Sequence, residues 1–342
     1  MGAPFWIVNF DKKCYGGGGA KLGELFLDGL PIDLLHWVIP VWDTKTLIAI
    51  RRDCPHLAHH SASPDSKLLR LPDELLRMVF LMIEAEDFFD AASLCLADGR
   101  LLDIGYNELQ RLKISVYADC AGDRIAGIAG WPWIMHLPES LTALAKEHAA
   151  EVPPQARNSW LKDNDLRLDV DVTYKKIVPI QYMKDQPFLS KLSRAESYAF
   201  SRLKCVTYTS SQPWVLCNIS KGVYVRADAV AKLAGKECDG SPLVDGRLGL
   251  DQAFLSQICW ATESSLAMVY QGGDEDAHGN IYQFNQGPWA GDRFEVTTID
   301  CMKKNIEWRD VSAKIVNILE KICLGDFRNN WRKALEYGRR RY

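Results

Sequence analysis

The same short pattern occurs twice in this chain, and it constrains the fold more than any other feature of the sequence. Ala-Gly-Asp-Arg is followed by a large apolar residue both in Ala121–Ile125 and in Ala290–Phe294. Glycine permits a sharp turn, so each copy predicts a turn that opens a strand, with its aspartate bonded to nearby backbone. Two explanations remain open: a common turn that recurs by chance, or equivalent edges of a pseudo-symmetric sheet.

A third interpretation places both turns at one pocket. Asp123 and Asp292 would then be a catalytic acid–base pair, since two carboxylates in different environments can divide these roles. Arg124 and Arg293 would bind an anion, because the guanidinium fork matches carboxylate and phosphate. Two indoles would complete the ligand site: Trp131 and Trp289. This arrangement predicts a hydrolase or a transferase, whereas ordinary Asp–Arg ion pairs predict no chemistry.

Composition places the chain among globular proteins without a broad basic surface. It has 342 residues, of which 47% are hydrophobic and 25% are charged, with a formal net charge of −3. A chain of this length can bury a core and hold more than one domain, and the charge balance argues against nucleic acid as a partner. The ten cysteines form no C-x-x-C pair, which is typical of reduced thiols in the cytoplasm or nucleus. We expect no metal, no cofactor and no membrane span.

The stretch from Leu71 to Leu109 predicts three consecutive helices. Pro72 suits the first turn of a helix, and Asp73 suits its positively polarised end. A second helical piece begins at Phe88, and a third lies around Leu101. The apolar residues of the first piece recur at helical spacing: Leu71, Leu75, Met78, Val79 and Met82.

This stretch resembles the F-box, a helical motif that opens with Leu-Pro and a Glu-Leu-Leu-like run, here LPDELL. Its third helix carries ADGRLLDIG where the motif usually has a Cys-Arg-Trp-like signature. F-box proteins use the motif to dock on the linker subunit of a cullin-type ubiquitin ligase, so the resemblance implies that partner. The residues that would contact it are Leu71, Pro72, Leu75, Met78, Val79 and Phe89. Helical spacing fits equally well three helices that pack against the chain's own sheet.

Three parts of the chain together resemble a group of fungal hypothetical proteins: the opening FWIVNFDKK with KLGE, the F-box-like middle, and GPWAGDRF. This wider resemblance implies no activity and carries over no catalytic residue.

The remaining pattern predicts an α+β fold with a mixed or antiparallel sheet, because strands and helices alternate without a regular βαβ rhythm. We expect a strand, a glycine loop and a helix in residues 1–60, the F-box-like segment in 68–112, and an α+β domain with C-terminal helices in 113–342. Further strands are expected on both sides of Pro40 and over residues 112–117.

Taken together, these features predict an interaction or adaptor protein whose C-terminal region recognises a target. The alternatives are the enzyme with a pocket between the two turns, and a structural or self-associating protein.

Overall fold

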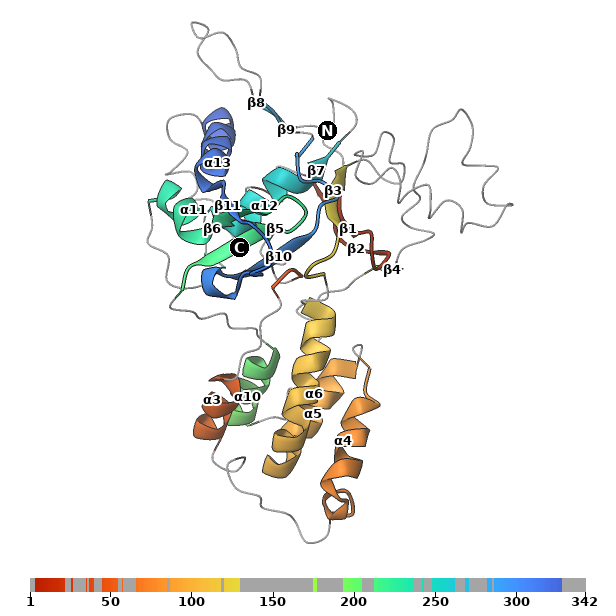
Figure 1. Cartoon of the computed structure of the whole chain (residues 1–342). Helices are drawn as coiled ribbons and strands as arrows, with labels where there is room; N and C mark the ends of the chain where they lie inside the picture. The colour runs from red at the N-terminus through yellow and green to blue at the C-terminus, as the bar shows by residue number, and fades with distance from the viewer. Residues whose placement is uncertain are drawn as a thin grey trace, which may run out of the picture. The chain divides into compact units, whose positions relative to one another are not determined.

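The structure is a computed structural model, and it divides the chain into two compact units (Figure 1). The sheet unit comprises residues 1–39, 120–177 and 209–342, and the helical unit comprises residues 40–119 and 178–208. The fold class is α+β, as predicted, although each unit combines segments that the predicted boundaries separated. The residues that the structure describes are 4–21, 26, 35, 37–39, 45–54, 57, 66–84, 87–117, 120–129, 175–176, 193–204, 212–235, 242, 248–261, 268–270, 282–284 and 286–327.

The first sheet of the sheet unit has the strand order β4-β2-β1-β3-β7. Its central strand β1 (Pro4–Asn9) pairs antiparallel with both β2 (Cys14–Lys21) and β3 (Ile125–Ala129). The short strands β4 (Lys175–Lys176) and β7 (Cys259–Trp260) extend its edges in parallel. The glycine run that was expected to form a loop, residues 16–19, is part of β2 instead, because β1 pairs along it.

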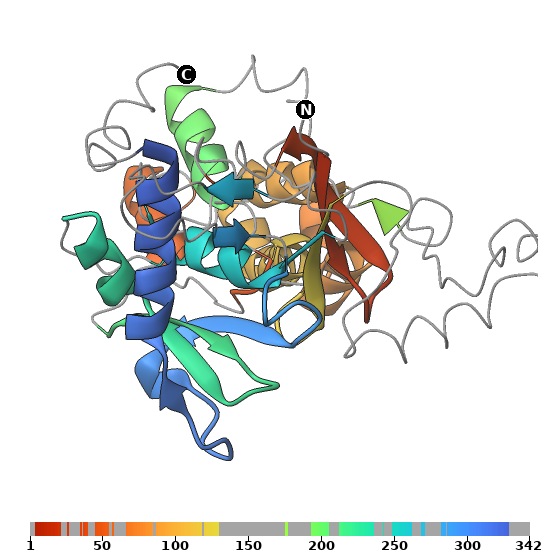
Figure 2. The same cartoon turned by 90° about the horizontal axis from the view of Figure 1, so that it is seen from above.

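The second sheet has the strand order β10-β5-β6-β11. Strand β5 (Trp214–Asn218) pairs antiparallel with β6 (Val223–Arg226) and β10 (Phe294–Thr298), and β11 (Arg309–Asp310) is parallel to β6. Three helices pack against β6 or β5: α11 (Ala227–Leu233), α12 (Leu250–Ile258) and α13 (Ser312–Phe327). Figure 2 shows α13 beside α11. The expected hairpin is present as β8 (Met268–Tyr270) and β9 (Tyr282–Phe284).

The helical unit consists of α3 (Lys45–Asp53), the 3-10 turn η2 (Leu68–Arg70), α4 (Asp73–Leu81), α5 (Phe88–Ala97), α6 (Gly99–Tyr117) and α10 (Arg194–Lys204). The three helices predicted between Leu71 and Leu109 are confirmed. The strands expected on both sides of Pro40 and over residues 112–117 are wrong where the structure describes these segments. Residues 37–39 form a turn, residues 45–50 lie in α3 and residues 112–117 lie in α6. Ile50 of α3 and Leu112 of α6 are buried in the core of this unit, so packing on the other helices outweighs the local preference for strand.

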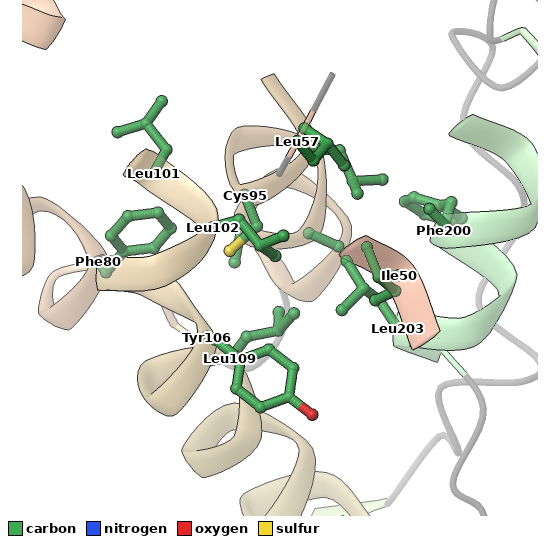
Figure 3. Packing of buried hydrophobic residues seen from close by; sticks show 14 of the residues in the cluster. Ile50, Leu57, Phe80, Cys95, Leu101, Leu102, Tyr106, Leu109, Phe200 and Leu203 are labelled. Carbon is green, nitrogen blue, oxygen red and sulfur yellow. The ribbon is translucent and has the colours of Figure 1, made fainter. Parts of the chain in front are cut away.

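Among the described residues, the core of the helical unit comes mainly from its helices. Figure 3 shows side chains from α3, α4, α6 and α10 converging there, with Ile50, Phe80, Leu102 and Phe200 among them. Phe80 lies over Gly105 of α6, where a Cβ atom would come within 2.3 Å of its ring, so only glycine allows α4 to approach α6 this closely. Among the described residues, this cluster contains no residue of a strand.

Among the described residues, no helix combines the length and the apolar character that crossing a bilayer requires.

Candidate functional site

The first and second sheets of the sheet unit contain the same module in the same register. Asn9 and Asn218 end the central strands β1 and β5. Asn9 pairs with Cys14 and Ile125, and Asn218 pairs with Val223 and Phe294. The outer strands β4 and β11 also join at matching positions. We call β1, β2, β3 and β4 the first module, and β5, β6, β10 and β11 the second module.

Each module contains one Ala-Gly-Asp-Arg turn, and the two turns have the same conformation. Gly122 has φ 87° and Gly291 has φ 82°, in the left-handed region that favours glycine. Each turn leads directly into a strand, β3 or β10. The strand register and the turn geometry show that the two turns are equivalent positions of two similar modules. The expectation of equivalent edges of one pseudo-symmetric sheet is corrected, because the turns lead into strands of two separate sheets.

The two turns lie against each other and bond across the modules. The amide of Gly122 donates to the carbonyl of Phe294 at 2.6 Å, and the amide of Gly291 donates to the carbonyl of Ile125 at 2.9 Å. Arg124 and Arg293 form an isolated antiparallel bridge. Each turn therefore satisfies the backbone at the start of the strand in the other module, and the pair of turns joins the two modules.

Asp123 and Asp292 bind asparagine side chains. Asp123 Oδ2 accepts a hydrogen bond from Asn9 Nδ2 at 2.9 Å, and Asp292 Oδ2 accepts one from Asn218 Nδ2 at 2.8 Å. The expectation that the two carboxylates bond to backbone is wrong, because their partners within the described residues are side chains. The asparagines bond to the backbone instead: Asn9 Oδ1 accepts from the amide of Lys12, as Asn218 Oδ1 does from the amide of Lys221, both at 3.0 Å.

Each carboxylate is also paired with a lysine of its own module. Lys12 Nζ lies 3.6 Å from Asp123 Oδ2, and Lys221 Nζ lies 2.7 Å from Asp292 Oδ2. The asparagines and lysines were not among the residues singled out from the sequence. A signal for them exists, since NFDK and NISK share the Asn-x-x-Lys spacing and each directly follows the hydrophobic run of its module.

The two arginines bind an acid that the sequence did not single out, Asp11. Arg124 donates to Asp11 from its Nε at 2.8 Å and also from Nη2, and Arg293 Nη1 lies 3.0 Å from Asp11 Oδ2. Burial would raise the pKa of the Asp11 carboxyl, but the hydrogen bonds from Arg124 and the charges of both arginines outweigh it, so its pKa is lowered. Both guanidinium groups thus have an internal carboxylate partner.

The two tryptophans do not complete a ligand site among the described residues. Trp289 is buried, with 5% of its surface exposed and its ring 6.2 Å from that of Phe294. Trp131 lies outside the described residues. A cavity of about 420 Å³ does occur in the sheet unit, but it is lined by residues of β6, α11, β11 and α13, among them Arg226 and Asp310, and by neither turn. The arrangement of the turns is that of a structural joint between modules.

The helix α4 presents a different kind of surface, a row of exposed apolar side chains. Their exposed fractions are 44% for Leu75, 56% for Met78, 52% for Leu81 and 81% for Met82. Leu76 and Phe80 cover the opposite side and are buried. We call Leu75, Met78, Leu81 and Met82 the α4 face.

The other expected contact residues divide between surface and core. Pro72 is exposed and Val79 is partly buried, and Leu71 is partly buried and packs against the core of the helical unit. Phe89 is 3% exposed, and its ring stacks on that of Phe200 with centroids 5.7 Å apart. Its assignment as a partner contact is therefore corrected to a core position, because the second helix turns this side chain inward.

Comparison with known proteins finds no matching family model, no similar curated protein and no similar solved structure.

Proposed function

We propose that this chain is an interaction protein that docks through the α4 face on the linker subunit of a cullin-type ubiquitin ligase. The observation that supports the proposal is the row of apolar side chains exposed on α4 and at Met82, which directly follows its last residue. Contiguous apolar surface of this kind is uncommon on soluble proteins unless it binds something. The choice of partner rests on the resemblance of LPDELL and the following helices to the F-box.

The geometry suits a helix laid into an apolar groove. Leu75, Met78 and Met82 follow one another at spacings of three and four, so they share one side of α4. Methionine side chains are unbranched and polarisable, and they adapt to the shape of a partner. The sheet unit, with its two modules, would then be the part that recognises a target, which corresponds to the C-terminal role expected from the sequence.

A binding experiment with the full chain and the purified linker subunit tests this function. The wild-type chain should bind, and Leu75→Asp and Met78→Asp should each reduce the affinity by more than roughly a hundredfold, since an interface centre does not tolerate a buried unpaired charge. Circular dichroism should show that both variants remain folded, because these side chains lie outside the core.

Ile48→Asp is the matched control. Ile48 is an apolar residue of the same unit that is 70% exposed, on α3 rather than α4. This variant should bind as the wild type does. Absence of binding by the wild type, or equal binding by all variants, would contradict the proposal. Dimerisation of the free chain that Met78→Asp abolishes would assign the α4 face to self-association instead.

A further inference from the structure

One arginine of α6 is bonded to the chain at the start of α4. Arg100 Nη1 donates to the carbonyl of Leu69 at 2.5 Å, and Nη2 donates to the carbonyl of Leu71 at 2.9 Å. Nε and Nη2 both donate to Asp73 Oδ1, at 2.9 Å and 2.5 Å. A single guanidinium thus holds two backbone carbonyls and a carboxylate over five consecutive residues. We call this set of contacts the Arg100 clamp.

The backbone of Arg100 is itself fixed, so the clamp is anchored to α6. The amide of Arg100 donates to Asp98 Oδ1 at 2.8 Å, and the amide of Leu102 donates to the carbonyl of Asp98 at 2.9 Å. Asp98 is 9% exposed and lies directly before the first residue of α6. The run ADGRLLDIG, which stands in place of the usual F-box signature, therefore supplies the clamp, its anchor and the glycine under Phe80.

The contacts that fix the position of α4 on α6 lie near both ends of the helix. Within α4 the buried side chains are Leu76 and Phe80, and Phe80 lies over Gly105 toward the C-terminal end of the helix. The Arg100 clamp holds the N-terminal end. Together they determine the direction in which α4 leaves Pro72 and, with it, the orientation of Leu75 and Met78.

We infer that Arg100 is a positioning residue for the α4 face, which sets the affinity for the linker subunit without being the contact itself. The inference rests on the proposed function. It requires arginine in particular, because the planar fork can serve two carbonyls and a carboxylate at once, whereas a lysine ammonium is a point charge that cannot reproduce this geometry. The side chain is 27% exposed, against 61% for Asp73, so it lies largely behind the segment that it holds.

The test compares Arg100→Lys with the wild-type full chain in calorimetric titration with the purified linker subunit. We expect roughly a tenfold loss of affinity, with the far-ultraviolet circular dichroism unchanged. Amide hydrogen exchange of the free chain should show lost protection over residues 69–76 and unchanged protection over α5. Arg111→Lys is the matched control, because Arg111 makes a 2.8 Å ion pair with Glu108 on the same helix and lies outside the clamp. It should bind like the wild type.

A second variant separates positioning from general stability. Leu203→Ala removes a buried side chain of α10 that takes no part in the clamp, and it should lower the melting temperature while leaving the affinity unchanged. If Leu203→Ala lost as much affinity as Arg100→Lys at equal stability, or if Arg100→Lys bound like the wild type, the inference would be overturned. A wild-type chain that does not bind overturns the proposed function and the positioning role with it. Hydrogen exchange would then still show whether the clamp holds α4.

Discussion

Arg124 and Arg293 face each other in an antiparallel bridge, and both guanidinium groups bind the carboxylate of Asp11. Because the arginines belong to different modules, a single acid of the first module, Asp11, links the two modules. The counterpart of Asp11 in the second module is Ser220, whose Oγ accepts a hydrogen bond from the amide of Arg293 at 2.9 Å. Asp11 Oδ2 accepts from the amide of Arg124 at 2.8 Å in the same way. The second module therefore lacks the carboxylate that Asp11 supplies in the first module.

Restoring that carboxylate should stabilise the protein. Ser220→Asp gives Arg293 an acid in its own module, equivalent to the one that Arg124 already has. Because Ser220 is exposed, the expected gain in the free energy of unfolding is up to about 1 kcal/mol, measured by urea denaturation. Ser220→Asn, which offers an acceptor without charge, should give no gain. A loss of stability in Ser220→Asp would contradict the equivalence of the two positions.

Asp11 should make stability depend on pH at the acid end. Its folded pKa is lowered from an ordinary value of 3.8, so its contribution to the free energy of unfolding is complete above about pH 5 and is lost as the pH falls through the folded value. Asp11→Asn removes this contribution. The difference in unfolding free energy between wild type and variant should therefore shrink as the pH is lowered from roughly 6 to 3.

Local patterns in the sequence predicted the elements well where a single signal decides them. The helices between Leu71 and Leu109, the turn before Val223 and the hairpin after Met268 each carry such a signal in periodicity or turn chemistry. The glycine run 16–19 did not, because its strand state depends on pairing with β1, and no local preference reports a pairing partner. Residues 112–117 were mistaken for a strand because a β-branched run can also continue a buried helix.

The candidate site could be predicted only in part, for a related reason. The repeated turns could be recognised in the sequence. The contact of Asp11 with both arginines could not, because it forms only when two turns that are distant along the chain pack against each other. On α4, two adjacent leucines lie on opposite sides of the helix: Leu75 is exposed and Leu76 is buried. Periodicity identifies an apolar helix, whereas only packing decides which of two adjacent leucines faces solvent.

The two equivalent aspartates should differ in their effect on stability. Asp292→Asn should lower the free energy of unfolding by about 1–3 kcal/mol. The carboxylate is 10% exposed and lies 2.7 Å from Lys221 Nζ, so the substitution would remove a nearly buried ion pair and place an amide donor near the ammonium group. Asp123→Asn should cost less than about 1 kcal/mol, since its lysine is 3.6 Å away and the group is more exposed. Denaturation of both variants measures this. Unchanged stability in both, together with loss of a ligand or of turnover, would instead favour the pocket interpretation.

The thiols should react in an order set by burial. Cys301 is exposed, whereas burial, together with the charge of Glu295, raises the pKa of Cys217 to about 12, and burial raises the pKa of Cys95 and Cys259. Because the thiolate is the reactive form, titration of the native protein with Ellman reagent near pH 8 should show a fast phase that Cys301→Ser lowers by one thiol. Cys95, Cys217 and Cys259 should react only as the chain unfolds.

In denaturant all ten cysteines should react. A total below ten would reveal a disulfide, and bound metal in elemental analysis would contradict the expectation of free thiols. Early labelling of Cys217, which peptide mapping would detect, would mean that the second sheet opens without unfolding of the whole unit, because Cys217 lies on its buried central strand.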